Sequence, residues 1–480
     1  MNRVRWLIAS LFVLVVSWSL SMPLFSGPDE PANFVRSAAV VRGEFVGADA
    51  GVSLEKSYWT TTVNIDPQFG VANLVPWCFA PFSEKPACNL AIEDAAFVDN
   101  PPYTNMGRYP IFPFLISGVG TVFGANDVSV LASRLTLGAL SVALIGFAFS
   151  SVAHRRGSVP SLLMALTPGV IFLSAVMNPS ALEIASAIAL WTILPHVFES
   201  SPLTRVELSG VVVAGVVLIG TRPLGPALYL VVWLFCCAVT GGWARIGEVW
   251  KRLRNVWVLH IGVVAFAISW YAVVFSKHTG SPVTEGSASL GFMQQIIESV
   301  QHIPVVLEQG IGNFGWLDTP MPRVVLVLYF LVLVSLLVFA IVRSTLLTTS
   351  MVVSLCLVSA LLVVAQDINY YNLLRNFGSQ GRHVMPLLVG IPIIALRKVK
   401  LPSRANAVVV AAWAIIMVWS GLAALRRYAV GILPGNQLEM YTQAAWQPDI
   451  GIWLATFTLA FGAIASAWCA WRISVTAHDR

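Results

Sequence analysis

The chain starts with an apolar run of membrane length that leads to two adjacent carboxylates. Residues 5–31 read RWLIASLFVLVVSWSLSMPLFSGPDEP. A helix needs roughly 20 apolar residues to cross the hydrocarbon core, so the stretch 5–24 predicts a transmembrane helix. Arg3 and Arg5 stand at its N-terminal end, as in a signal peptide, but no small-x-small cleavage site follows. We therefore expect an uncleaved first helix with its N-terminus in the cytoplasm.

The composition extends this prediction to the whole chain. Hydrophobic residues make up 57 % of the 480 residues and charged residues 11 %, whereas a soluble domain carries roughly 25 % charged residues. Such a chain cannot cover a globular surface with polar groups, which excludes a soluble enzyme, a disordered chain and a nucleic-acid-binding domain. The net charge of +6 is assigned to cytoplasmic loops, and no nucleic-acid partner is expected.

Apolar runs of about the length of a membrane span recur along the sequence. They predict an all-α polytopic membrane protein, folded as a single integral membrane domain over residues 1–480, with about twelve crossings. The runs are 5–24, 128–152, 158–177, 180–198, 207–221, 224–240, 256–275, 324–343, 345–365, 384–398, 404–424 and 450–472.

Basic residues predict the orientation in a plasma membrane. With both termini in the cytoplasm, Lys and Arg gather in short inner loops, among them Arg155 with Arg156 and the clusters in 245–254 and 397–404. This is the positive-inside pattern. A further apolar piece, 109–123, would reverse every later loop if it crossed the membrane. We expect it to be a re-entrant or juxtamembrane helix, and a full crossing with one missed span is the alternative.

The long loops then lie outside the cytoplasm. Residues 25–108 form a large first extracytoplasmic loop with a juxtamembrane helix, and 276–323 form a second one. Long loops on a tight bundle usually carry function, so we expect the active face to be extracytoplasmic. Cys78 and Cys88 lie in the first loop, where an oxidising compartment favours a disulfide; two free thiols are the alternative.

The acidic pair Asp29-Glu30 stands where the first helix leaves the membrane. Behind it, Phe34, Ala38 and Val41 recur at helical spacing and predict a short amphipathic helix on the membrane surface. Two interpretations of the pair are open. In one, Asp29 caps this helix and Glu30 interacts with its dipole. In the other, the carboxylates supply a general base or hold a divalent cation, Mg²⁺ or Mn²⁺, beside a lipid phosphate.

The Pro28-Asp29-Glu30 placement resembles the GT-C superfamily of membrane glycosyltransferases, which includes the lipid A aminoarabinose transferases and the protein O-mannosyltransferases. Five further segments resemble a family of predicted polytopic membrane proteins that is common in actinobacteria and grouped with GT-C. They are NPPY (100–103), MNPSALE (177–183), RPLGP (222–226), GNFGWLDT (312–319) and QGRH (380–383). The resemblance implies a GT-C-type bundle that transfers a sugar from a polyprenyl-phosphate-linked donor to a cell-envelope acceptor outside the membrane.

The resemblance also implies roles for the acidic pair. Asp29 would be the general base that deprotonates the acceptor hydroxyl, and Glu30 would assist it or bind a cation. The sequence departs from related enzymes at Asn33, where many have His or an aromatic residue, and at Ser180, where many have Asp. Glu183 lies one turn after Ser180 and could replace that Asp. These departures leave metal dependence open.

The remaining candidate residues lie in the resembling segments. Arg222 and Arg382, the latter followed by His383, stand at the outer ends of spans, where a guanidinium is suited to hold the donor phosphate. Snorkelling to lipid headgroups is the alternative for these arginines. The other candidates for substrate binding are Tyr103, Asn178, Glu183, Trp316 and Asp318. The alternative for Trp316 is a place in the interfacial aromatic belt, and the alternative for Asp318 is the cap of a turn.

Three classes of function are open at this point. The first is the extracytoplasmic glycosyltransferase, and the others are a transporter or flippase of a lipid-linked saccharide and a non-catalytic envelope-assembly protein. Most spans lack charge in their central part, which favours surface chemistry over transport. The expected partners are the lipid bilayer, the polyprenyl-phosphate-linked donor and the envelope acceptor. The enzyme interpretation predicts that Asp29, Arg222 and Arg382 converge.

Overall fold

The computed structural model describes residues 2–50, 60–93, 100–155, 158–277, 290–433 and 435–478. Arg156 and parts of the two predicted outer loops lie outside the described residues. Eight described helices are long and apolar enough to cross a membrane. They are α1 (Asn2–Leu20), α4 (Asp127–Arg155), α7 (Ser180–Phe198), α11 (Arg254–Trp270, continued by the π-helical turn η5, Tyr271–Phe275), α13 (Arg323–Arg343), α14 (Leu346–Leu374), α17 (Ser403–Val430) and α19 (Ile452–His478).

The described helices include a ninth span if two helical parts joined at a sharp bend are counted as one span. Helix α9 (Gly225–Val239) is followed by η4 (Gly242–Arg245) and α10 (Ile246–Arg252), and the two parts meet at 104°. The prediction of an all-α polytopic membrane protein is confirmed. The number of about twelve crossings stays a prediction.

Prolines explain why several predicted spans are shorter or broken. Thr167 caps a new helix through its side chain, which accepts from the Val170 amide, and Pro168 supplies the first residue of that helix, where its missing N–H costs nothing. The run 158–177 is therefore divided at Thr167. The shorter helices are α5 (Val159–Ala165), α6 (Pro168–Ala175), α8 (Arg205–Thr221), α15 (Gly381–Leu388) and α16 (Gly390–Ala395).

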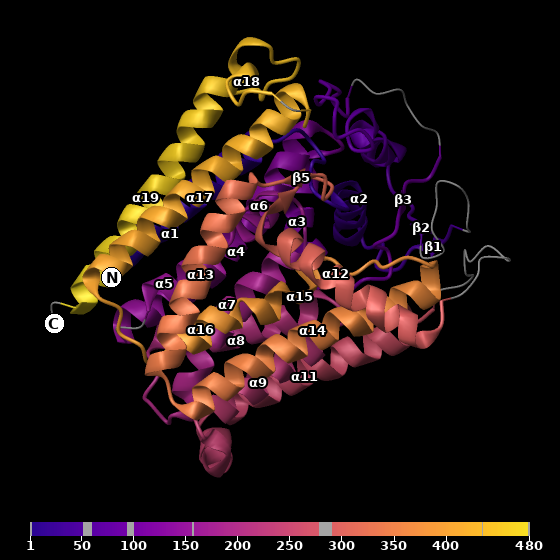
Figure 1. Cartoon of the computed structure of the whole chain (residues 1–480). Helices are drawn as coiled ribbons and strands as arrows, with labels where there is room; N and C mark the ends of the chain where they lie inside the picture. Colours follow the sequence, from indigo (N-terminus) through magenta and orange to yellow (C-terminus); the bar gives the residue numbers. More distant parts are fainter. Residues whose placement is uncertain are drawn as a thin grey trace.

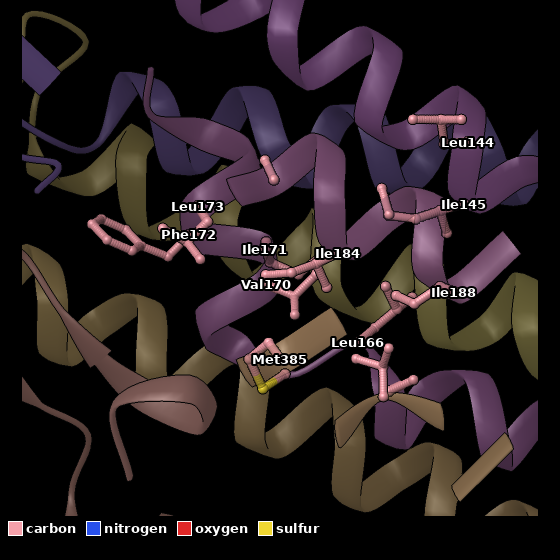
Figure 2. Close-up of a cluster of buried hydrophobic side chains, with 14 of the residues drawn as sticks. Leu144, Ile145, Leu166, Val170, Ile171, Phe172, Leu173, Ile184, Ile188 and Met385 are labelled. Atoms are coloured by element: carbon pink, nitrogen blue, oxygen red, sulfur yellow. The ribbon is translucent and has the colours of Figure 1, made fainter. Parts of the chain in front are cut away.

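The core lies around α7, which is almost completely buried along its length. Figure 2 shows Ile184 and Ile188 of α7 in one cluster with Ile145 of α4, Val170 of α6 and Met385 of α15. On one side of this core α1, α17 and α19 run side by side (Figure 1). Arg3 Nη1 donates to Arg472 O at 2.8 Å, so the two ends of the chain share one end of the bundle.

The opposite part of the molecule carries α2 (Glu30–Val41) and a small antiparallel sheet (Figure 1). The sheet order is β1 (Ala48–Asp49), β2 (Thr61–Thr62), β3 (Tyr103–Thr104), with Thr61 opposite both Asp49 and Thr104. The other elements here are η1 (Pro67–Asn73), η2 (Val75–Cys78), α3 (Phe112–Gly118), η3 (Val119–Phe123), α12 (Phe292–Gly312), and the hairpin β4 (Asn313–Phe314) and β5 (Thr319–Pro320). The short helix α18 (Glu439–Thr442) lies beside α17 and α19 instead (Figure 1).

Helix α2 is present, but it is not an amphipathic helix on a surface. Nearly all of its side chains are buried, because η1, α3 and η3 cover the face that the periodicity left for solvent. Arg36 is fully buried and its Nη2 donates to the carbonyls of Phe45 (2.8 Å) and Tyr109 (3.0 Å). Arg42 lies 4.5 Å over the ring of Phe69. The prediction that one face of this helix is exposed is therefore wrong, and its juxtamembrane position stays a prediction.

The apolar piece 109–123 forms α3 and the 3₁₀ turn η3. At about 1.5 Å per residue the seven residues of α3 extend only about 10 Å, far less than the roughly 30 Å of a hydrocarbon core. The piece packs against α2 and α4. Its re-entrant or juxtamembrane position stays our prediction.

Candidate functional site

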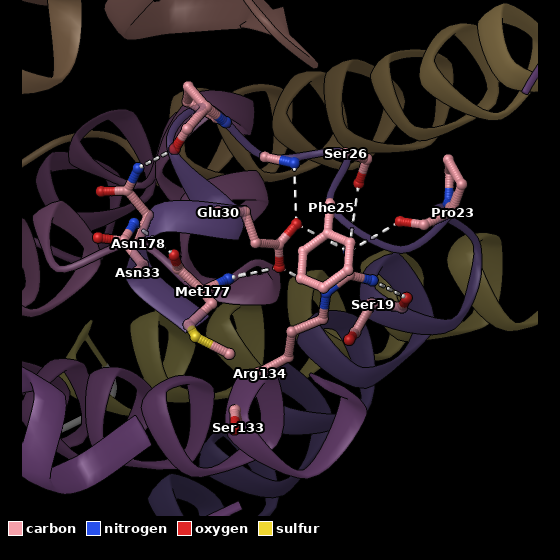
Figure 3. Close-up of polar contacts among 12 residues, drawn as sticks. Ser19, Pro23, Phe25, Ser26, Glu30, Asn33, Ser133, Arg134, Met177 and Asn178 are labelled. Carbon is pink, nitrogen blue, oxygen red and sulfur yellow. Dashed lines mark hydrogen bonds and ion pairs between the residues drawn. The ribbon is translucent and has the colours of Figure 1, made fainter. Parts of the chain in front are cut away.

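Glu30 is the buried half of the acidic pair. Its carboxylate receives two bonds from Arg134 of α4, Nε to Oε1 at 2.7 Å and Nη2 to Oε2 at 2.9 Å. The amides of Gly27 and Met177 donate to the same two oxygens at 2.9 and 2.8 Å. Figure 3 shows this carboxylate enclosed by its partners. Glu30 is completely buried, and four donors occupy its oxygens, which supports a structural role.

The segment after α6 is fastened to the acidic turn (Figure 3). Asn178 Nδ2 donates to Pro28 O at 3.0 Å, and Asn33 Nδ2 donates to Met177 O at 2.8 Å. Asn178 Oδ1 accepts from the Ser180 amide at 3.0 Å. The two segments that the sequence analysis singled out, 28–30 and 177–183, are thus one hydrogen-bonded unit. These contacts assign Asn178 to positioning the turn. They also involve Asn33 and Ser180, the two positions at which this sequence departs from the GT-C enzymes that it resembles.

Asp29 points the other way. Its backbone is left-handed (φ 59°) and its side chain makes no capping hydrogen bond to α2, so the capping interpretation is wrong. Oδ2 instead accepts from Arg382 Nη2. The side chain is partly exposed and lines a cavity of about 510 Å³. A carboxylate held on one side and open on the other can take a proton from a bound molecule.

Arg382 is the buried partner of Asp29. Its side chain is 7 % exposed, and neither Nε nor Nη1 has a hydrogen-bond partner among the described residues. Gly381 precedes it at the start of α15, and Gln309 of α12 accepts from the Gly381 amide at 3.0 Å. Buried guanidinium donors without acceptors are costly unless an anion joins them. The arrangement therefore suits a ligand phosphate.

Arg222 and Glu183 form a second buried ion pair next to the first, with Arg222 Nε 3.2 Å from Glu183 Oε2. Arg222 is close enough to interact electrostatically with Arg382 and with His383. Tyr109 belongs to the same group of residues, because the charges of Arg222, Asp29 and Arg382 act on its hydroxyl. Burial raises the pKa of this hydroxyl to about 12. Asp29 and Arg382 thus pair directly, and Arg222, which is paired with Glu183, interacts with Arg382 through its charge. That all three meet at one groove stays a prediction.

The cavity beside Asp29 lies between the start of α2 and residues of the predicted first outer loop. Tyr103 of β3 lines it, and so does Trp316 of the β4–β5 turn. Trp316 Nε1 donates to Phe25 O at 3.0 Å, which fixes the indole ring at the wall. Both predicted residues are therefore placed at the cavity together with Asp29.

Asp318 supports this wall and does not face the cavity. Oδ1 accepts from the Trp316 amide at 3.1 Å and from Thr319 Oγ1 at 3.0 Å. Oδ2 accepts from Nε and Nη2 of Arg427 at 3.1 and 2.8 Å. Arg427 is almost completely buried and also donates to the carbonyl of Phe79 at 3.0 Å. The same ion pair thus reaches the turn of Trp316 and the loop that contains Cys78.

Cys78 and Cys88 form a disulfide in that loop. The bridge joins two residues ten positions apart, and the loop between them accepts from Arg427 Nη1 at the carbonyl of Lys85 (2.7 Å). A short bridged loop has little conformational freedom. The cavity wall formed by this loop is therefore held in place before any ligand binds.

Gly381 allows the close approach that positions Arg382. A Cβ at this glycine would lie 2.1 Å from Gly310 N and 2.6 Å from Gln309 C of α12, which are backbone atoms that cannot rotate away. Gly381→Ala is therefore expected to destabilise the protein by about 1–3 kcal/mol and to displace Arg382. Gly262→Ala in α11, where nothing lies within 4 Å, is the control. Thermal unfolding of the two purified variants measures the difference, and equal melting temperatures would contradict the prediction.

The residues present do not form a divalent-cation site. Among the described residues no group of three His, Cys, Asp or Glu lies close enough together to hold a metal ion. Glu30, the second predicted ligand, has both oxygens bonded to Arg134, Gly27 and Met177. Asp29 alone would be left to a cation. The described residues therefore do not offer the set of oxygen ligands that a divalent cation needs.

Two arginines of this region escaped the sequence analysis. Arg134 lies inside the predicted span 128–152, and a charged residue within a span is a signal of function or buried pairing. Arg427 follows the predicted span 404–424 and carries no local motif. Tyr109 was visible only as part of an apolar piece. Nothing in the sequence near these residues identifies their partners.

The family model described as a predicted membrane protein, DUF2142, matches residues 12–391 of the chain. No curated protein matches this chain. The crystal structure of ArnT from Cupriavidus metallidurans in the apo state is similar with 12 % identity and a TM-score of 0.48, over 100 % of this chain and 78 % of that chain. The structure of ArnT bound to undecaprenyl phosphate is similar with 14 % identity and a TM-score of 0.48, over 99 % and 77 %. A likeness at this TM-score carries no argument about this chain, and the expected actinobacterial occurrence stays a prediction.

Proposed function

We propose that this chain, which belongs to the DUF2142 family of predicted membrane proteins, is an inverting GT-C-type glycosyltransferase. It transfers a sugar from a polyprenyl-phosphate carrier to a cell-envelope acceptor at the extracytoplasmic face of the plasma membrane. The proposal rests on one observation: Asp29 lines a cavity and pairs with a buried arginine whose other donors are free.

Asp29 is the general base of the proposed reaction. Oδ2 accepts from Arg382, and Oδ1 is left to accept the proton of an acceptor hydroxyl in the cavity. The hydroxyl oxygen attacks the anomeric carbon of the donor sugar from the side opposite to the phosphate. The new glycosidic bond forms as the bond from the anomeric carbon to the phosphate oxygen breaks, and polyprenyl phosphate leaves with the bonding electrons. The proton passes from Asp29 to solvent.

Arg382 stabilises the leaving phosphate. Its Nε and Nη1 lack partners and can donate to two phosphate oxygens, a geometry that guanidinium groups suit well. Charge that grows on the phosphate during bond cleavage is then met by donors already in place, which is an effective form of catalysis. Arg222 adds a second positive charge nearby, and Glu183 holds it in position.

Replacement of Arg382 by Gln tests the phosphate role. Hydrogen bonds to charged groups contribute about 1.5–3 kcal/mol, so Arg382→Gln is expected to weaken binding of undecaprenyl phosphate by roughly 10- to 150-fold. Native mass spectrometry or microscale thermophoresis of the purified full chain measures this affinity. Arg343→Gln at the exposed end of α13 is the matched control and should bind normally.

The lipid without its phosphate separates the possible outcomes. If undecaprenol binds wild type as tightly as undecaprenyl phosphate, or if Arg382→Gln binds the phosphate normally, the proposed function fails. A flippase is distinguished by reconstitution into vesicles, because it would move a polyprenyl-phosphate sugar between leaflets without forming a new glycosidic bond. A non-catalytic assembly protein would show neither transfer nor movement.

A further inference from the structure

The cavity beside Asp29 has an unusual lining for a site next to two arginines. Among the described lining residues Asp29 is the only charged one, and the rest are prolines, alanines, aromatic residues, asparagines and threonines. Its volume of about 510 Å³ lies within the roughly 300–1,000 Å³ of small-molecule sites. The cation that is near, Arg382, contacts Asp29 and does not line this cavity.

Two tryptophans give the cavity flat apolar surfaces. Trp77 of η2 is 61 % exposed and lines the cavity, and Trp316 lines it from the β4–β5 turn. A large exposed ring on a loop that a disulfide fixes is an apolar surface that nothing in the described structure covers. Tryptophan combines a broad apolar face with little loss of side-chain freedom when a ligand binds. The C–H faces of a sugar ring fit such a surface.

Asn105 supplies a hydrogen-bond acceptor that has no partner in the described part of the chain. Its Oδ1 is buried, makes no hydrogen bond and belongs to a residue of the cavity lining. A buried polar atom without a partner costs about 1–3 kcal/mol, so a ligand that donates to it gains affinity. Hydroxyl groups are the matching donors, since a carboxylate or a phosphate brings only acceptors at neutral pH.

The walls are prepared before the ligand arrives. The Cys78–Cys88 disulfide begins at the residue next to Trp77. Arg427 joins the bridged loop to Asp318, which accepts from the amide of Trp316. Rigid walls reduce the entropy lost on binding. The stacking surfaces are thus part of the folded protein.

From these observations we infer that the cavity is the acceptor subsite and that it takes an uncharged glycan. The word acceptor rests on the proposed function, whereas the choice of an uncharged glycan rests on the lining alone. The sugar rings lie against Trp77 and Trp316, a hydroxyl donates to Asn105 Oδ1, and the hydroxyl that reacts faces Asp29. An acidic glycan or a phosphorylated acceptor would meet the Asp29 carboxylate with no described lysine or arginine in the lining to offset it.

Binding to immobilised glycans tests this inference. The full chain in detergent is applied to an array of neutral oligosaccharides and of oligosaccharides that contain uronic acids or phosphate. Neutral glycans are expected to bind. Trp77→Ala is expected to weaken their binding about tenfold, the effect of losing one stacking contact. Trp243→Ala is the control, because Trp243 is 51 % exposed but lies in η4, outside the cavity.

Asn105→Leu guards against a purely structural explanation. Removing an unpartnered polar atom should leave the melting temperature equal or higher, while neutral-glycan binding falls. Binding of acidic glycans only, binding of none, or equal binding by Trp77→Ala would overturn the inference. Undecaprenyl phosphate binding in the same preparation separates the two proposals. If it depends on Arg382 but no glycan binds, this inference fails and the proposed function stands. If neutral glycans bind through Trp77 but Arg382 has no role, the proposed function fails.

Discussion

Membranes that carry Asp29→Asn are expected to contain inserted protein, because the side chain is 28 % exposed and the Asn oxygen can still accept from Arg382. They are expected to lose glycan transfer by a factor of roughly 10² to 10⁴, the usual contribution of a general base. Asn removes the basic oxygen without changing the size of the side chain. It also suits the left-handed backbone at this position (φ 59°), because Asn and Asp adopt this region more readily than other residues with a Cβ. Incorporation of the labelled donor sugar into envelope glycan measures the loss.

The control for Asp29→Asn is the same exchange at Asp66. Asp66 is exposed, lies in the same predicted loop and accepts from the Gln68 amide at 2.9 Å as the cap of η1. Its replacement should leave transfer intact. Unchanged envelope glycan in cells that depend on Asp29→Asn would refute the base assignment, and equal melting temperatures of the wild type and Asp29→Asn would exclude misfolding as the cause of a loss.

Glu30→Gln is expected to produce the reverse result, a loss of folded protein. The exchange places an amide NH₂ against the donors of Arg134, Gly27 and Met177 and leaves the Arg134 charge unpaired at 2 % exposure. Breaking a buried ion pair by removing one partner costs about 3–5 kcal/mol. Thermal unfolding of the purified protein in detergent is expected to show a large drop in melting temperature.

Glu439→Gln is the matched control for this loss. Glu439 pairs with Arg426 at 3.1 Å, but its side chain is 34 % exposed, and an exposed pair contributes only about 0–1 kcal/mol. If Glu30→Gln melts like wild type and yet loses transfer, Glu30 takes part in the chemistry and its assignment as a structural group is wrong. If Asp29→Asn loses transfer but stays folded and Glu30→Gln loses stability, the two adjacent carboxylates have different roles, one in catalysis and the other in folding.

The sequence analysis predicted the helical class because hydrocarbon thickness and backbone hydrogen bonding leave few solutions for a chain this apolar. It failed where tertiary packing overrides a local pattern. The periodicity of Phe34, Ala38 and Val41 predicted a surface helix, but α3 and η1 cover the other faces of α2. No local signal in 30–41 could reveal that cover, since it comes from residues up to 80 positions away.

For the candidate site, the segments were easier to predict than the directions of their side chains. Asp29 pairs with Arg382 and Arg222 pairs with Glu183, while Glu30, Asn178 and Asp318 face inward and bind protein groups. Neighbouring residues at a helix start can point in opposite directions, so Asp29 and Glu30 were indistinguishable from their sequence. The inward direction of Glu30 depends on Arg134, and that of Asp318 depends on Arg427. Each of these buried arginines is more than 100 positions away from its partner in the sequence.

The partner of Asp318 has a consequence for where the protein can be shortened. Arg427 lies beyond residue 391, where the family match ends, and α19 packs along α1 at the other end of the sequence. A chain that stops at residue 391 would retain Asp29, Arg222 and Arg382, yet it would leave the Asp318 carboxylate unpaired and one side of α1 bare. The segment that matches the family model is thus shorter than the segment that must fold together, because residues after 391 complete the ion pair of Asp318 and cover α1.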